Sequence, residues 1–224
     1  MSTYKAIRKV PSVAQADPKV IAMLREIPVA ALSDNMHRNI GTVGLHPYHR
    51  PGKTTMAGTA VTARSRAGDN LTYLRALEFC RPGDVLVIDA GGDLNNAGVG
   101  GILSFYAASI GVVGVVIDGA LRDVAEIRER DFPVYARGVT HRGPYKDGPG
   151  EINVPISVGG MVVNPGDIVV GDQDGLLAIP QPGIEELIEK ARAHLEAEAK
   201  TIQAMKEGRW DRSFIDALEA RCNN

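Results

Sequence analysis

The sequence predicts an α/β protein in which a parallel or mixed sheet lies beneath helices. Residues 111–117 form an apolar, β-branched run bounded by glycine, which is typical of a strand buried on both faces. The segment after it, residues 124–132, has helical spacing. A second apolar run at residues 85–88 follows a Pro-Gly-Asp turn, and a helix is expected to begin near Ile102. These two strand-to-helix units are the basis of the predicted fold class.

The composition is that of an ordinary globular protein. Of the 224 residues, 23% are charged and 44% are hydrophobic. The formal net charge of -2 does not indicate the positively charged surface that binds nucleic acid. Cys80 and Cys222 lack the spacing of a disulfide framework or a zinc site, and we expect Cys80 to be a small core residue. No stretch reaches the ~18 apolar residues of a membrane span, and no apolar signal region opens the chain. We therefore expect a cytoplasmic protein that binds neither nucleic acid nor membranes.

Residues 1–57 are expected to form a helical extension and a loop. Residues 1–17 are typical of a mobile lead-in, and a helical pattern begins at Pro18 and ends at Pro28, before a second helix. Residues 39–58 form a long connection rich in glycine and proline. Three histidines in this region fit no metal motif, so ordinary surface or turn positions are favoured over a metal cluster: His37, His46 and His49.

A glycine-rich loop is expected between the strand at residues 85–88 and the next helix. Before it, residues 58–70 alternate apolar and polar side chains, as in a half-buried strand, and residues 71–80 form a short amphipathic helix. Residues 91–101 carry five glycines and lead directly into the helix. Backbone N–H groups at such a helix start can bind an anion, here a small carboxylate rather than a nucleotide, because no phosphate-loop spacing is present. A flexible turn without a ligand is the alternative.

Arg122 and Asp123 stand side by side where the strand at residues 111–117 gives way to a helix. Ligands of α/β sheets bind beyond the carboxyl ends of strands. An arginine there can grip an anionic oxygen and an aspartate can hold a hard cation. The alternative is that Asp123 caps the following helix while Arg122 is a solvated surface charge.

The rest of the chain is expected to contain more strands and a helical arm. Residues 133–145 predict a strand and a basic loop, and residues 152–158 and 161–179 contain further strand candidates. From residue 183 onward a long amphipathic helix has an apolar stripe too narrow to be buried all round. Its carboxylates are typical of a solvated face. Alternatively, the arm packs on a neighbouring subunit and lends an acid to that subunit's site.

Five segments carry a resemblance to a known family: GDNL at residues 68–71, PGDVLVIDAGGD, GVVIDGALRD, INVPISVGG and PGDIVVGDQDG. Together they resemble the class II pyruvate aldolases, the 4-hydroxy-4-methyl-2-oxoglutarate/4-carboxy-4-hydroxy-2-oxoadipate aldolases, which share a fold with RraA-like regulators of ribonuclease E. The resemblance implies a layered α/β/β/α sandwich whose core is of the swivelling β/β/α type. Helical extensions are expected at the N-terminus and the C-terminus. It divides the chain into an extension at residues 1–57, a catalytic core at 58–182 and an arm at 183–224.

The same resemblance implies roles for individual residues. Arg122 and Asp123 would bind the pyruvyl group and a divalent metal, and Lys146 would contact substrate. Glu198, in preference to Glu196, would reach the metal site of a neighbouring subunit in a homotrimer or homohexamer. Backbone N–H groups for the pyruvyl carboxylate would come from the start of the helix, at Gly100, Gly101, Ile102 and Leu103.

One position departs from the family pattern. Gly101 stands where the aldolases typically carry an acidic residue that holds metal-bound water. Asp89 and Asp93 are the candidates that could replace this acid. The departure bears directly on whether the site is catalytic.

The chemistry of the Arg122–Asp123 pair favours an enolate-forming lyase. Cleavage of a carbon–carbon bond next to a 2-oxo acid leaves an enolate, whose charge a metal on Asp123 and the Arg122 guanidinium could stabilise without a Schiff-base lysine. Asp is a hard oxygen ligand, so Mg²⁺ or Mn²⁺ is preferred. We expect cleavage of a 4-hydroxy-2-oxo acid to pyruvate and decarboxylation of oxaloacetate. The alternative is a non-catalytic RraA-like regulator that binds a ribonuclease or another protein.

Overall fold

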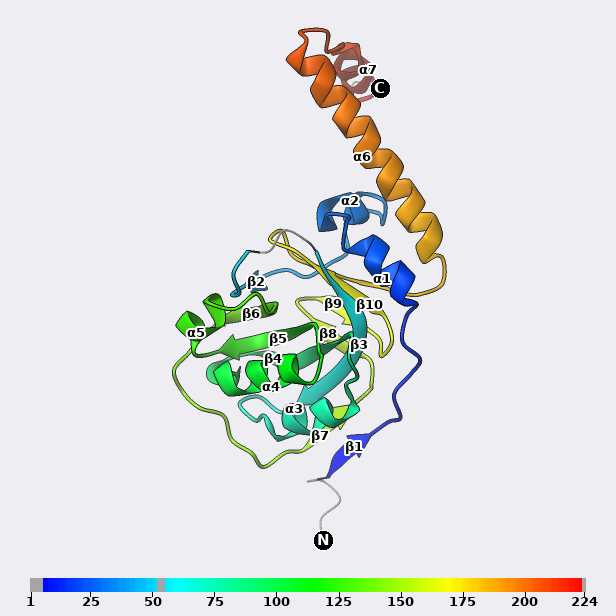
Figure 1. Ribbon diagram of the computed structural model, residues 1–224. Coiled ribbons are helices and arrows are strands. Elements are labelled where there is room, and N and C mark those ends of the chain that lie inside the picture. Colours follow the sequence, from blue (N-terminus) through cyan, green and yellow to red (C-terminus); the bar gives the residue numbers. More distant parts are fainter. Residues whose placement is uncertain (1–5, 52–54, 223–224) are drawn as a thin grey trace.

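Four layers build the protein in the order helices, sheet, sheet, helices (Figure 1). The computed structural model describes residues 6–51 and 55–222. The strands are β1 (Ile7–Lys9), β2 (His46–Pro47), β3 (Met56–Ser65), β4 (Asp84–Val99), β5 (Gly114–Leu121), β6 (Val134–Val139), β7 (Gly150–Ile152), β8 (Ile156–Val158), β9 (Met161–Val163), β10 (Ile168–Gly171) and β11 (Leu176–Ile179). The helices are α1 (Pro18–Leu24), α2 (Val29–Asp34), α3 (Leu71–Ala76), α4 (Gly101–Ser109), α5 (Val124–Arg128), α6 (Ile184–Lys206) and α7 (Ser213–Cys222).

Three buried apolar clusters separate these layers. The first lies between the helices α3 and α4 and one face of β3, β4 and β5. The second lies between the opposite face of those strands and the strands β8 to β11. The third lies between β10, β11 and the outer helices α1, α2 and α6. This arrangement confirms the predicted α/β/β/α layering.

The parallel strands β3, β4, β5 and β6 form the part of the sheet that positions the helices α4 and α5. The apolar, β-branched run of the sequence lies in β5, and its residues are buried throughout, as predicted. The strand differs from the predicted one in its bounds, because it begins at Gly114 and continues through Asp118 and Gly119 to Leu121. The chain leaves the carboxyl ends of β4 and β5 at the same edge, where Val99 is paired with Leu121. Both α4 and α5 therefore begin at one edge of the sheet.

Two sequence expectations about strands are wrong. The glycine-rich stretch after residue 90 is not a loop, because β4 continues to Val99 through several register shifts opposite β5. The strand β3 is not half-buried, because it lies between β4 and β10 and both of its faces are covered. Its polar positions are nevertheless satisfied: the Thr62 hydroxyl donates to Val154 O over 2.6 Å, and Thr59 Oγ1 accepts from Ala16 N over 3.0 Å.

The N-terminal segment is bound to the core rather than mobile over its described part. The strand β1 pairs in parallel with β7, and Val10 N donates to Ile152 O. Residues 1–5 lie outside the described residues. The expectation of a mobile lead-in at residues 1–17 is therefore wrong from residue 7 onward.

The helix α6 belongs to the core at its start and leaves the core toward its end (Figure 1). Ile184, Ile188 and Ala191 are buried against the outer layer, whereas Trp210 and Phe214 beyond the helix are 39% and 50% exposed. Among the described residues, no helix combines the length and the apolar character needed to cross a membrane.

Candidate active site

The edge where β4 and β5 end brings together most of the residues singled out in the sequence. Arg122 N donates to Val99 O over 3.0 Å, so the ends of the two strands are joined just before α4 and α5 begin. A cavity of about 250 Å³ opens at this edge. Six of the predicted site residues line it: Gly100, Ile102, Leu103, Arg122, Asp123 and Lys146.

Asp123 occupies the N-cap position of α5 in a left-handed conformation, with φ 64° and ψ 37°. Asp is one of the few residues with a side chain that adopts this conformation at modest cost. Its side chain makes no capping hydrogen bond with α5. Instead, Oδ2 accepts a 2.9 Å hydrogen bond from Gly101 N and lies 3.7 Å from Arg122 Nε. The alternative that Asp123 serves only to cap its helix is therefore wrong.

The start of α4 lies at the cavity and carries backbone donors that no helical carbonyl accepts from. The first intrahelical bond runs from Ser104 N to Gly100 O, so the N–H groups of Ile102 and Leu103 have no acceptor within the helix. The Gly101 N–H, by contrast, is already committed to Asp123. Gly100 must lack a side chain, because a Cβ there would lie 2.7 Å from Asp123 Oδ2 and 3.1 Å from Arg122 Cγ.

Asn70 is a cavity residue that the sequence reasoning did not identify. It precedes α3 and is buried, and its Nδ2 donates to Gly98 O over 3.2 Å. Its Oδ1 is buried without a hydrogen-bond partner among the described residues. An unpaired buried acceptor is costly, so it marks a place where a ligand or water donates. The sequence does contain a sign of this role, because the polar Asn70 of the GDNL segment directly precedes the amphipathic helix α3.

The neighbouring residue Asp69 holds the loop that carries Lys146. The buried Asp69 carboxylate accepts hydrogen bonds from Asp147 N at 2.6 Å and Gly148 N at 3.0 Å through Oδ2, and from Leu71 N at 3.0 Å through Oδ1. Tyr145 N also donates to Gly68 O. These bonds hold the loop at the cavity wall that Lys146 lines, the residue for which the family resemblance implied a substrate contact.

Two carboxylates considered as replacements for the missing acid at position 101 lie elsewhere. Asp89 Oδ1 accepts from Gly91 N, and Asp93 Oδ1 accepts from both the backbone and the side chain of Asn95. Neither residue lines the cavity. The expectation that Asp89 or Asp93 takes over that role is wrong, because both carboxylates stabilise the bulged part of β4.

Glu198 is not part of this cavity within one chain. It lies on the exposed half of α6 and accepts a 3.2 Å hydrogen bond from His194 Nε2. The helix α6 extends away from α4 and α5, at whose starts the cavity lies, so Glu198 could act only in the site of another subunit (Figure 1). Its predicted role therefore stays a prediction.

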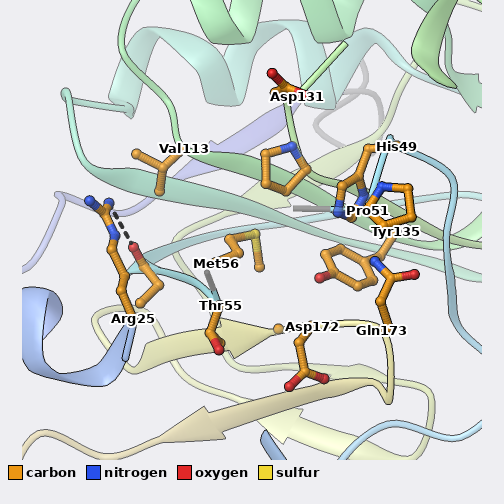
Figure 2. A pocket seen from close by; sticks show the side chains of 13 residues that line it. Arg25, His49, Pro51, Thr55, Met56, Val113, Asp131, Tyr135, Asp172 and Gln173 are labelled. Atoms are coloured by element: carbon orange, nitrogen blue, oxygen red, sulfur yellow. Dashed lines mark hydrogen bonds between the residues drawn. The ribbon is translucent and has the colours of Figure 1, made fainter. Parts of the chain in front are cut away.

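A larger cavity of about 480 Å³ lies at the opposite, amino-terminal ends of the parallel strands (Figure 2). Its polar groups already serve the fold: Arg25 donates to Ala57 O, Thr55 donates to Ile27 O, and Asp172 accepts from Val29 N. Burial lowers the pKa of His49, whose Nδ1 accepts from Val134 N over 3.2 Å. We therefore take the smaller cavity as the candidate active site, because the Asn70 acceptor has no partner among the described residues and the first N–H groups of α4 have no acceptor within the helix.

The expectation that Cys80 is not a nucleophile agrees with the structure. Burial raises the pKa of the Cys80 thiol to about 12, which makes a nucleophilic role at neutral pH unfavourable. Over residues 6–51 and 55–222, no group of three or more His, Cys, Asp or Glu side chains converges as a metal cluster.

The cavity nevertheless fits a hard cation that keeps most of its water. Asp123 Oδ1 and Asn70 Oδ1 are oxygen donors of the kind that Mg²⁺ prefers, and Mg²⁺ is commonly held by only one or two protein carboxylates. The donor set contains no sulfur or imidazole ligand, so it favours Mg²⁺ or Mn²⁺ over zinc.

Comparison with known proteins identifies the family. The model of the RraA-like family, described as Aldolase/RraA, matches residues 29–178. The chain belongs to the RraA-like family. A relative from Halalkalibacterium halodurans, provisionally named a 4-hydroxy-4-methyl-2-oxoglutarate aldolase, is 39% identical over 180 residues, which are 80% of this chain and 84% of that protein. A Thermus thermophilus protein named 4-hydroxy-4-methyl-2-oxoglutarate aldolase is 40% identical over 131 residues, 58% of this chain and 79% of that protein.

Solved structures of RraA-like proteins share the fold. An uncharacterized protein from Pseudomonas syringae superimposes with a TM-score of 0.77 at 25% identity, covering 89% of this chain and 94% of that chain. RraAS2 of Streptomyces coelicolor, described as an unusual member of the RNase ES inhibitor RraA family, has a TM-score of 0.75 at 27% identity, covering 84% of this chain and 97% of that chain. The RraA-like family thus includes proteins named as aldolases and proteins named as inhibitors of RNA processing.

Proposed function

We propose that this RraA-like protein is a divalent-cation-dependent lyase that cleaves a 4-hydroxy-2-oxo acid to pyruvate and also decarboxylates oxaloacetate. The observation that carries the proposal is the cavity in which Arg122, Asp123 and the free N–H groups of α4 surround one space. The names of the two aldolase relatives support the same reaction class. Both substrates share a 2-oxo acid end, and both reactions develop negative charge on the ketone oxygen.

The start of α4 is suited to the carboxylate of such a substrate. The N–H groups of Ile102 and Leu103 lack helical acceptors, and the positive end of the helix dipole adds a favourable field. Two parallel N–H donors fix the orientation of a carboxylate. The substrate is thereby presented with its ketone toward Arg122.

Arg122 is suited to the charge that develops on the ketone oxygen. Its guanidinium lies at the cavity wall beside Asp123, 41% exposed, so it is hydrated until substrate enters. A positioned cation strengthens its interaction as the enolate charge forms, which is the kind of binding that lowers a barrier. The fork of the guanidinium can also donate to two oxygens at once.

Asp123 is the residue that would hold the cation. Gly101 N fixes Oδ2 of its carboxylate, and the left-handed backbone at Asp123 directs the side chain toward α4. Mg²⁺ or Mn²⁺ held there would supply Lewis acidity to the ketone and carboxylate oxygens of the substrate. Asn70 Oδ1 is placed to accept a hydrogen bond from a substrate hydroxyl or a water. Lys146 adds a positive charge for the distal, second carboxylate of a dicarboxylic substrate.

The proposal also includes a homotrimer or homohexamer in which Glu198 of one subunit completes the site of the next. Its support is the direction of α6, which carries the exposed Trp210 and Phe214 away from the core. Exposed aromatic side chains of this kind are typical of an interface between subunits.

A coupled assay of pyruvate release tests the proposal. The purified chain is incubated with oxaloacetate and a panel of 4-hydroxy-2-oxo acids, with Mg²⁺, with Mn²⁺ and with excess EDTA. We expect pyruvate formation that needs the cation and that disappears with EDTA. No release above the uncatalysed rate from any substrate would contradict the lyase.

In that case the alternative function, a non-catalytic regulator that binds a ribonuclease or another protein, would explain the observations better. A Thermus thermophilus structure described as an RNA-processing inhibitor, RraA, is 35% identical with a TM-score of 0.62, over 70% of this chain and 94% of that chain. Inhibition of a ribonuclease by the purified chain would then be the measurement to make.

A further inference from the structure

Glu126 lies three residues after Asp123, a spacing that commonly forms a capping box at the start of a helix. Neither carboxylate is used in that way. The Asp123 side chain makes no capping bond with α5, and Glu126 pairs with Arg130, which lies just beyond the end of α5. Both carboxylates instead lie against the first turn of α4: Asp123 accepts from Gly101 N, and Glu126 packs beside Gly101.

The two consecutive glycines of α4 make room for these two carboxylates. A Cβ on Gly100 would lie 2.7 Å from Asp123 Oδ2. A Cβ on Gly101 would overlap Glu126 Oε2 and lie 2.8 Å from Glu126 Cδ. The space in which a side chain at position 101 would begin is therefore filled by a carboxylate, but this carboxylate is carried by α5.

A separate observation indicates that the cavity beside these carboxylates binds a ligand. Asn70 is 8% exposed, lines the cavity and has an unpartnered Oδ1. Two carboxylates, those of Asp123 and Glu126, therefore lie at the start of α4, and the residue with the unpartnered acceptor, Asn70, lines the same cavity as Asp123. Such a set suits a hydrated divalent cation, whose water molecules donate to acceptors around it.

We propose that Glu126 is a second carboxylate of the cation site centred on Asp123 and that it acts in the place of a side chain at position 101. This inference rests on the proposed function. Glu126 does not line the cavity, so it is a positioning residue that acts through the water shell of the cation and through Asp123. Arg130 is the ion-pair partner of Glu126, while its Nη1 donates to Gly101 O over 3.3 Å and its guanidinium lies over the Phe105 ring.

Binding of Mn²⁺ to the full-length chain without substrate, followed by electron paramagnetic resonance, tests the inference. Glu126→Gln keeps the shape and an acceptor for Arg130 but removes the charge. We expect its Mn²⁺ affinity to fall about tenfold, the loss typical of an outer-shell partner. Glu129→Gln removes the same charge three residues along the chain and is expected to bind Mn²⁺ within about twofold of wild type.

Relocation of the acid provides a second, independent measurement. The double variant Glu126→Ala with Gly101→Asp moves the carboxylate onto α4, and we expect its affinity to return to within about threefold of wild type. Arg130→Met separates charge from structure, because it removes the partner of Glu126 but leaves the carboxylate. We expect it to retain Mn²⁺ binding. Equal loss in Arg130→Met and Glu126→Gln would mean that Glu126 matters only as an ion-pair partner, which would overturn the inference.

Failure of the inference is distinguishable from failure of the proposed function. Wild-type Mn²⁺ affinity in Glu126→Gln, together with pyruvate release by the wild-type chain, overturns the role of Glu126 and leaves the lyase intact. Absence of pyruvate release from the wild-type chain overturns the lyase whatever Glu126 does. Circular dichroism of each variant identifies any loss that is due to unfolding.

Discussion

The backbone N–H of Gly101 donates a 2.9 Å hydrogen bond to Oδ2 of Asp123, which joins the first residue of α4 to the residue that precedes α5. The bond spans two elements that are separate in sequence but begin at the same edge of the sheet. It fixes one oxygen of the carboxylate and leaves Oδ1 for a ligand. The charge of Asp123, rather than its hydrogen bond, is therefore the property that the proposed cation needs.

We expect Asp123→Asn to abolish cation-dependent turnover while the fold is retained. Asparagine tolerates the left-handed conformation and can still accept from Gly101 N, so only the charge is lost. Pyruvate release should fall at least about 100-fold, equivalent to ~2.7 kcal/mol in the transition state. Asp131→Asn, at an exposed position, is the matched control. Turnover in Asp123→Asn equal to that of the control would remove Asp123 from the cation site.

We expect Arg122→Lys to lower kcat/KM at least about tenfold, or ~1.4 kcal/mol. Lysine keeps the charge but loses the planar fork that donates to two oxygens at once. Arg128→Lys on the exposed side of α5 is the control and should behave as wild type. Initial-rate kinetics with oxaloacetate measure both variants. If Arg122→Lys shows wild-type kinetics, then Arg122 does not contact the substrate.

Local patterns in the sequence predicted the α/β class and several residues of the candidate site, whereas the order of the four layers followed from the family resemblance. The buried run of β5 and the adjacent Arg122 and Asp123 are contiguous in the chain, so a strand end with two charges could be identified directly. The glycines before α4 identified the other wall of the cavity. Both sides then meet because the carboxyl ends of parallel strands share one edge.

The remaining features depend on contacts between distant segments. Asp123 has the position of a helix cap, and only the approach of α4 draws its side chain to Gly101. The Asn70 side chain is held by Gly98 O, which accepts from its Nδ2, while its Oδ1 has no partner among the described residues. The glycines of β4 led to the prediction of a loop. Glycine also permits β-bulges, however, and through such bulges this strand continues along β5.

Glu151 should make stability depend on pH. The hydrogen bond with Arg64 Nε (3.1 Å), together with Arg8, lowers the pKa of the Glu151 carboxyl and fastens β1, β7 and β3 together. Because the folded pKa lies below the ordinary value of about 4.3, the stabilisation is present above that value and is lost as the pH falls through the folded pKa.

Urea unfolding of wild type and Glu151→Gln measures this effect. At pH 7 the variant should be less stable by about 0.5–1 kcal/mol, since the arginines are partly exposed and screened. The difference should shrink steadily as the solution is acidified below pH ~4. A difference that is constant between pH 7 and pH 3 would mean that the pairing contributes no stability.

The arm should be essential for a site shared between subunits, and the structure defines where it can be cut. Truncation after Pro182 would remove Ile184 and Ile188, which are buried in the outer core, so it would test folding rather than assembly. Truncation after Ala197 keeps this packed half and removes Glu198 with the exposed aromatic residues. We expect light scattering to show a trimer or hexamer for the full chain and a smaller species, without turnover, for the truncated chain.

Mixing of two inactive variants tests the shared site directly. In a site built from Asp123 of one subunit and Glu198 of its neighbour, Asp123→Asn and Glu198→Gln are each expected to be inactive, whereas Glu196→Gln retains turnover. Random reassembly of the two inactive variants should restore about a quarter of the wild-type activity, because about one site in four then receives both intact carboxylates. A monomer in solution, or a mixed oligomer without activity, would show that Glu198 does not complete the neighbouring site.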